Sequence, residues 1–281
     1  MDYSITKHEV SGGYMNQRFS IVPIFYLAFL LIPLYWLLTM SFKPMKELAG
    51  QLTLYPKSPT LDHYQVIFSD SSWYLGYLNA TVYVLMNVAI CLVAAIPAAY
   101  AFSRYRFFGS RPLFFGLLAF RMMSPAILLI PIVQIFSDLN LIDTYIAVAL
   151  AHCFFNLPIA IWILEGFISS VPAELDELAR IDGYNLATYF RKILLPTIAP
   201  GIAVAAFFCF LFSWTEVILS NALTTIDVKP IGAIMSRVSS VFTANVPILS
   251  AAGVLTLIPG ILIVILVRRH LTRGFSMGRV D

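Results

Sequence analysis

Long apolar runs restrict the folds open to this chain more than any other feature of its sequence. Four runs carry no charged residue: 21–42, 144–164, 197–214 and 248–267. A helix needs about 20 apolar residues to cross a bilayer, and it satisfies its backbone hydrogen bonds internally. The whole chain is 59% hydrophobic and 12% charged, whereas soluble domains are about 45–50% apolar and about 25% charged. These observations predict an all-α membrane protein.

Two further runs complete a prediction of six transmembrane helices. Residues 73–102 carry no charge but exceed the length of one crossing, so we expect this helix to tilt or to lie partly at an interface. Residues 113–136 contain one charge, Arg121. Prolines inside the runs predict kinks, because neighbouring helices can satisfy the freed carbonyls. The chain is therefore divided into a polar tail (1–20), a six-helix transmembrane domain (21–267) and a basic tail (268–281).

The distribution of positive charge predicts that both termini are cytoplasmic. Twelve of the 18 Lys and Arg residues fall in the two tails and in the connections that share their side of the membrane. Five fall on the other side, and Arg121 lies within a run. Lys and Arg accumulate on the cytoplasmic side of membrane proteins. The first 20 residues have no apolar core, so they are interpreted as a cytoplasmic tail and not as a secretory signal.

The cysteines, the charge distribution and the absence of a nucleotide-binding motif argue against several classes of function. Its three cysteines, Cys91, Cys153 and Cys209, lie inside apolar runs as small buried hydrophobes do, and no Cys/His cluster suggests a metal site. The net charge of +3 is dispersed, which argues against nucleic-acid binding. No Gly-x4-Gly-Lys-Ser/Thr loop is present, so the chain is not predicted to bind a nucleotide or to be an enzyme. We expect it to bind no cofactor of its own.

Two long connections, 43–72 and 220–247, are predicted on the outer side. In the second, apolar residues recur at helical spacing: Ile231, Ile234, Val238 and Val241. This pattern predicts a helix that lies either at an interface with another protein or against its own bundle.

A polar segment, 170–196, interrupts the apolar runs and includes ELDELARIDGYNLATYFRKILLP. Acidic residues near its start suit the positive end of a helix dipole, and Gly183 permits a left-handed turn that would end this first helix. A second amphipathic helix is predicted from Asn185 to Leu194. Two short helices meeting at a glycine would form a cytoplasmic knob suited to a cleft in another protein.

The spacing within this segment resembles the EAA loop of ABC-transporter permeases. The pattern is Glu-Ala-Ala, three residues, Gly, nine residues, then Ile-x-Leu-Pro, with Leu178 here in place of the first alanine. The wider segment VPAELDELARIDG and the tail RRHLTRGFSMGRVD are similar to permeases of the carbohydrate-uptake, maltose-permease type. SWTEVILSNAL is similar to another stretch of that class, from which Thr215 and Val217 depart. The resemblance implies that the residues coupled to the ATPase are Glu177, Ala179, Asp182, Gly183, Ile193, Leu195 and Pro196.

The same resemblance implies a multi-subunit importer in the bacterial inner membrane. Its expected partners are a second, homologous permease chain, two ATP-binding subunits that hold ATP and Mg, an extracytoplasmic solute-binding protein and membrane lipid. The expected solute is a sugar or polyol, including glycerol or a glycerol phosphate. An ion-coupled secondary transporter and a membrane-embedded enzyme are the alternatives, although buried carboxylates and convergent catalytic groups are scarce in the runs.

Polar and aromatic residues within the runs are candidates for the translocation pathway, since charges in lipid usually face a cavity or a partner. Arg121 could line the route or pair within the bundle. Glu216 could lie near the cavity or at the interface. The candidates for the pathway are Arg121, Glu216, Trp214 and Asn156.

Overall fold

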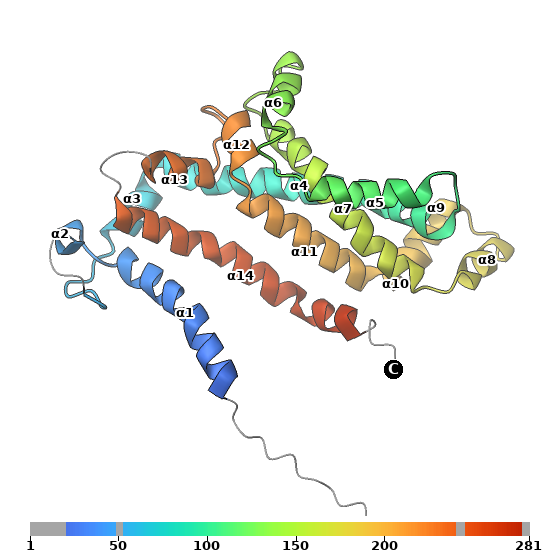
Figure 1. The fold of residues 1–281 in the computed structure, drawn as a ribbon, viewed down its shortest axis with the longest axis horizontal. Coiled ribbons are helices and arrows are strands. Elements are labelled where there is room, and N and C mark those ends of the chain that lie inside the picture. Colours follow the sequence, from blue (N-terminus) through green and yellow to red (C-terminus); the bar gives the residue numbers. More distant parts are fainter. Residues whose placement is uncertain (1–20, 49–52, 240–244, 277–281) are drawn as a thin grey trace, which may run out of the picture.

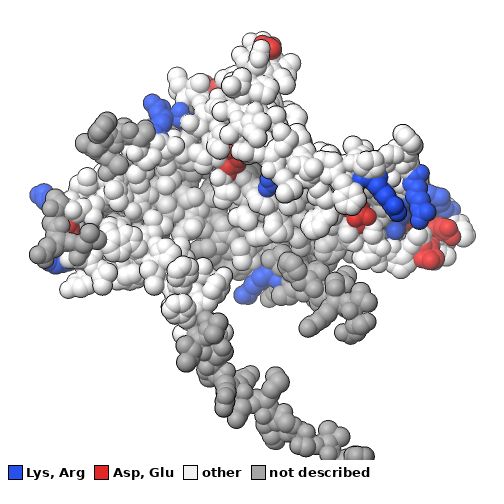
Figure 2. Space-filling model, in the orientation of Figure 1, with Lys and Arg blue, Asp and Glu red and all other residues white. Residues whose placement is uncertain are grey.

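A computed structural model describes residues 21–48, 53–239 and 245–276. These residues form helices and connecting loops, with no strand among them, which confirms the all-α prediction. The molecule is elongated, with its longest helices running roughly along its length (Figure 1). On the face shown in Figure 2, most charged side chains lie toward the two ends, and few lie between them. This distribution suits a protein whose middle lies in lipid.

Four helices are long and apolar enough to cross a membrane. They are α1 (Ile21–Ser41), α4 (Ser71–Arg104), α7 (Tyr145–Ser169) and α14 (Val246–Ser276). A fifth candidate is α11 (Ala199–Thr215) together with the short helices before it, from which it is bent by 79°. The run 73–102 thus forms one unbroken helix, α4, that continues through Pro97.

The run 113–136 does not form one continuous helix, contrary to the prediction. It divides into α5 (Ser110–Arg121) and α6 (Leu129–Asp138), separated by a turn. Pro125 lies in that turn, and a proline disfavours the helical conformation of the residue before it. Hydropathy alone does not predict this break between α5 and α6, because the turn that separates them is itself mostly apolar.

The remaining helices are short and lie mainly at the ends of the bundle. At one end are α2 (Met45–Leu48), α3 (Asp62–Ser69) and α13 (Ile231–Ser239), and at the other α8 (Glu174–Ile181) and α9 (Leu186–Tyr189) (Figure 1). A π-helical turn, η1 (Phe190–Leu194), and α10 (Leu195–Thr197) lead into α11, and α12 (Ile218–Leu223) follows it. The predicted helix at 231–241 is thereby confirmed as far as Ser239, and Val241 lies outside the described residues.

The core is built around α4 and α7, which pack along each other and against α11. Small residues allow close helix contact, as at Gly201, where an added Cβ would lie 2.4 Å from Phe167 Cγ. Two buried asparagines join the three helices: Asn87 donates to Ala149 O, and Asn156 donates to Cys209 O and to Asn87 Oδ1. In contrast, α1 packs chiefly on α14 and leaves much of its apolar surface exposed.

The three cysteines are free thiols. Cys91 and Cys209 are buried, as expected, and Cys91 Sγ lies 3.4 Å from Cys153 Sγ. At the carboxyl end, α14 continues past Val267 to Ser276, so the first part of the predicted basic tail is helical. Residues 1–20 and 277–281, predicted as parts of the two tails, lie outside the described residues.

Candidate coupling loop and polar cavity

The segment 174–184 forms a helix with a glycine-dependent end. The acidic residues Glu174, Asp176 and Glu177 occupy the first turn of α8. Gly183 has φ +80°, the left-handed conformation predicted for it. Its amide donates to Arg180 O and the amide of Tyr184 donates to Ala179 O. These two bonds form a Schellman motif, which satisfies carbonyls at the helix end.

The second helix of the predicted pair is shorter and more complex than expected. Asn185 caps α9 by accepting a hydrogen bond from Thr188 N, and the chain then passes through η1 into α10. The helical path therefore continues through Pro196 and ends at the bend before α11. A π-turn widens the helix locally and is frequent at functional sites.

The seven residues of the EAA pattern divide into an exposed set and a packed set. Ala179 is buried, and Ile193 and Leu195 are half-buried. The exposed residues are Glu177, Asp182, Gly183 and Pro196. Beside them, Leu178, Ile181 and Leu186 expose large apolar side chains, with Ile181 80% exposed. We call Leu178, Ile181 and Leu186 the apolar tip.

Asp176 connects this loop to the end of α4. Its carboxylate accepts hydrogen bonds from Tyr100 Oη (3.0 Å), from Tyr189 Oη and from Arg104 Nε (3.0 Å). Arg104 also donates to Val171 O at 2.8 Å. The sequence indicates for Asp176 only a place among the acidic residues that suit the helix dipole, because Tyr100 and Arg104 are distant in the chain. We call Tyr100, Arg104, Asp176 and Tyr189 the Asp176 cluster.

Three of the four predicted pathway residues lie together. Arg121, Asn156 and Glu216 line a cavity of about 180 Å³ between the end of α5 and helices α7 and α11. We call it the polar cavity, and its remaining lining residues are Pro125, His152, Phe155, Phe212 and Thr215. Trp214 faces elsewhere: its Nε1 donates to Thr256 O of α14, and its ring stacks on Phe210.

Arg121 has neither an ion pair nor a hydrogen bond within the described part of the chain. Its guanidinium lies over the Phe212 ring, 4.3 Å from the centroid. Its Nε is buried and is the one buried side-chain polar atom without a partner among the described residues. Leaving such a donor unsatisfied costs about 1–3 kcal/mol, and more for a charged group. Arg121 therefore lines the polar cavity and makes no ion pair within the described part of the bundle, and its role in the route stays a prediction.

Glu216 is held by an internal network. Its carboxylate contacts His152 Nε2 at 3.1 Å and accepts the amides of Leu219 and Ser220 at the start of α12. Because a carboxylate only accepts, Nε2 donates, and Nδ1 contacts Ser213 Oγ at 2.7 Å. Ser213 is fully buried, so this Ser-His-Glu arrangement leaves no accessible nucleophile. His152 also lines this cavity but is not among the predicted pathway residues. Its position in the apolar run 144–164 is the one sequence signal that could have indicated this.

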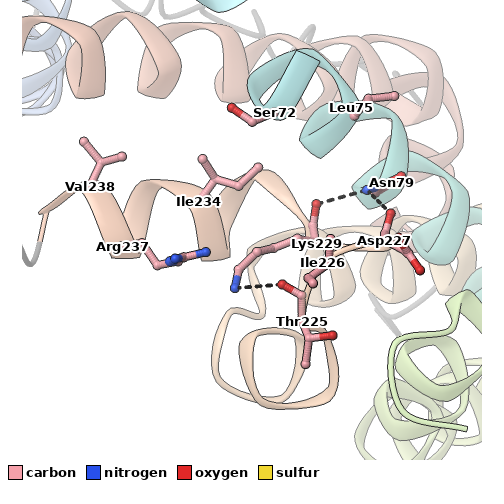
Figure 3. Close-up of a pocket in the computed structure, with 10 residues that line it drawn as sticks. All are labelled: Ser72, Leu75, Asn79, Thr225, Ile226, Asp227, Lys229, Ile234, Arg237 and Val238. Carbon is pink, nitrogen blue, oxygen red and sulfur yellow. Dashed lines mark hydrogen bonds between the residues drawn. The ribbon is translucent and has the colours of Figure 1, made fainter. Parts of the chain in front are cut away.

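A larger pocket of about 500 Å³ lies at the α13 end, between the start of α4, the segment 225–229 and α13 (Figure 3). Lys229 and Arg237 extend toward it from two sides, with Ile234 and Val238 along the α13 wall. Burial, and then the nearby Arg237, lower the pKa of Lys229. Asn79 of α4 donates to Asp227 O and Lys229 O, which ties the segment 225–229 to that helix.

Comparison with known proteins places this architecture among transport proteins. Residues 91–277 match the family of binding-protein-dependent transport system inner membrane components. Because the match covers more than half of the chain, the chain belongs to this family, and the predicted resemblance is confirmed. It is an inner membrane component of such a system.

Individual relatives span nearly the whole chain. The trehalose transport system permease protein SugB of Mycobacterium tuberculosis is 28% identical, covering 96% of this chain and 99% of SugB. The arabinooligosaccharides transport system permease protein AraQ of Halalkalibacterium halodurans is 32% identical, covering 91% of this chain and 93% of AraQ. A similar fold occurs in a bacterial ABC transporter that imports the acidic polysaccharide alginate (TM-score 0.75, 21% identity, 89% of this chain and 93% of that one).

Proposed function

We propose that this chain is the sugar-conducting permease subunit of an ATP-driven importer. One observation supports it most: a short, motif-bearing helix, α8, exposes an apolar tip while the Asp176 cluster fixes its base to α4. A surface with that geometry suits docking into a cleft of an ATPase. An ion-coupled transporter or a membrane enzyme needs no docking surface for an ATPase, so neither alternative is favoured.

The proposed assembly contains this chain, a second permease, two ATP-binding subunits that hold ATP and Mg, and an extracytoplasmic binding protein. Family membership supports the binding protein, because the family is named for its dependence on one. In this proposal both termini and α8 are cytoplasmic, and the bundle crosses the membrane six times, with α5 and α6 together forming one discontinuous crossing. The α13 pocket then faces the binding protein.

The proposed solute is an oligosaccharide or a smaller sugar. Relatives named for trehalose and for arabinooligosaccharides support this class. The polar cavity would form part of the route, with the second permease completing its wall, since about 180 Å³ is below the roughly 300–1,000 Å³ typical of ligand pockets. ATP-driven closure of the ATPases would move α8, and differential ATP binding to the two states would shift the cavity between outward and inward access.

The docking role is tested with Ile181→Asp. This side chain is 80% exposed, so its replacement should leave the fold intact while placing a charge in the ATPase contact. We expect co-purification of the ATPase with the tagged permease to fall about tenfold or more, the effect of losing an interface hot spot.

Leu54→Asp is the matched control, because Leu54 is 70% exposed and lies in the connection between α2 and α3, two helices at the opposite end of the molecule from α8 (Figure 1). Both variants should reach the membrane in normal amounts. Undiminished ATPase recovery with Ile181→Asp would refute docking at the apolar tip.

A further inference from the structure

Arg121 brings to the polar cavity a positive charge that has no ion-pair partner among the described residues. No carboxylate among the described residues lies within ion-pair distance of it. Glu216 is the carboxylate that lines this cavity, and it is already engaged by His152 and by the amides that begin α12. A carboxylate or other anion in direct contact with Arg121 would therefore come from outside the described chain.

The surroundings of Arg121 suit a charged ligand that also has an apolar face. Phe212 lies beneath the guanidinium, and Phe155 forms another part of the cavity wall. A guanidinium is a planar fork of donors that matches the oxygens of a carboxylate, sulfonate or phosphate group, and it remains charged at any physiological pH. An aromatic wall can at the same time pack against the apolar face of a sugar ring.

We propose that Arg121 binds the acid group of an anionic saccharide as it passes through the cavity. This inference rests on the proposed function, since it assigns a solute class to the same pathway. The cavity is small, about 180 Å³, so it would receive the acidic end of the solute and not a whole oligosaccharide. Uronates, sugar sulfonates and sugar phosphates share the required chemistry.

The test uses the complete complex of this chain with its second permease and ATP-binding subunits, reconstituted in nanodiscs. Binding of a uronate disaccharide, a disaccharide monophosphate and a neutral disaccharide would be measured by scintillation proximity with each radiolabelled probe. We expect at least one anionic probe to bind more tightly than the neutral one, and Arg121→Gln to weaken that binding by about tenfold or more. Arg121→Lys, which keeps the charge, should retain part of the preference. Arg111→Gln is the matched control, since Arg111 lies at the other, exposed end of α5.

The outcomes separate this inference from the proposed function. ATP hydrolysis by the same preparation tests the importer assembly independently of the solute. A complex that hydrolyses ATP but binds no anionic probe, or binds anionic and neutral probes equally, would overturn the acidic-solute assignment alone. So would an unchanged preference in Arg121→Gln. If Arg121→Gln instead fails to assemble with the second permease while Arg121→Lys assembles, the counter-charge is a carboxylate of that subunit, and the proposal is wrong.

Discussion

Asp143 joins two distant segments of the chain through a single carboxylate. It lies between α6 and α7 in the left-handed region, with φ 63°, and accepts hydrogen bonds from the Thr225 hydroxyl and from the amides of residues 225–228. Burial alone would raise the pKa of Asp143, but these hydrogen bonds outweigh it and hold the pKa well below its usual range. The α13 pocket depends on this contact, because Thr225 and Lys229 line it.

Asp143→Asn should destabilise this end of the molecule. Asparagine tolerates the left-handed backbone but can accept through one oxygen only, so we expect a loss of about 1–3 kcal/mol of stability. A group with a depressed folded pKa contributes stability above its unfolded pKa and loses it as pH falls through the folded value. The difference in melting temperature between wild type and variant should therefore stay constant from about pH 8 to about pH 5.

Asp227→Asn is the control for this measurement, since Asp227 is exposed nearby. A difference for Asp143→Asn that vanished already between about pH 7 and about pH 6 would contradict the depressed pKa.

Residue-scale prediction from sequence worked where the cause was local. The left-handed Gly183 and the helix it ends depend on neighbours within a few positions, so the motif was sufficient to predict them. The partners of Asp176 and His152 lie on other helices, with Asp176 and Arg104 separated by 72 positions. Such contacts depend on helix packing, which no local pattern encodes.

At the scale of elements, α4 contacts both the segment that lines the α13 pocket and the base of α8. Near one end, Asn79 holds the segment 225–229, and at the other end Tyr100 and Arg104 hold Asp176 of α8. Hydropathy predicted its length but not these attachments. The division of the run 113–136 into α5 and α6 was missed because a proline can either kink a membrane helix or end it, and the surrounding helices decide which.

Breaking the Asp176 cluster should uncouple ATP hydrolysis from transport. Asp176→Asn and Arg104→Gln each weaken the attachment of α8 to α4 but leave the apolar tip unchanged. We expect the ATPase to co-purify normally while transport per ATP hydrolysed falls several-fold, measured in proteoliposomes with binding protein and solute. The double variant should lose little more than either single variant, because both remove the same interaction.

Glu174→Gln is the matched control, as Glu174 is an exposed acid in the same turn of α8. Strictly additive losses in the double variant, or normal transport per ATP in Asp176→Asn, would show that the cluster does not couple the two helices.

At the scale of the whole molecule, the sequence largely predicted which connecting segments lie together at the same end of the bundle. The predicted outer connections, 43–72 and 220–247, include α3 and α13 at one end, and the 170–196 loop includes α8 at the other (Figure 1). Charge asymmetry and apolar length carry this information, since both are properties of whole segments. The lateral packing of the bundle was not predictable, because it depends on shapes such as that of Gly201 against Phe167.

The proposed orientation is tested by chemical labelling. In a variant with the native cysteines replaced, Ser58→Cys should react with a membrane-impermeant maleimide in intact spheroplasts, and Asn185→Cys should react only after permeabilisation. Both positions are exposed, so access to the reagent depends on the side of the membrane. Labelling of Asn185→Cys in sealed spheroplasts would reverse the assigned topology.

The length of α4 has a geometrical consequence. Its 34 residues make a rod of about 50 Å, at about 1.5 Å per residue. Pivoting such a rod by about 5° at one end displaces the other end by about 4 Å, more than the 1–2 Å helix shifts that suffice at many subunit interfaces. A rigid helix of this length can transmit a displacement from one end to the other without a series of local rearrangements between them. In the proposed orientation, a slight change of angle imposed where Asp176 contacts α4 would displace Asn79, on the other side of the bilayer.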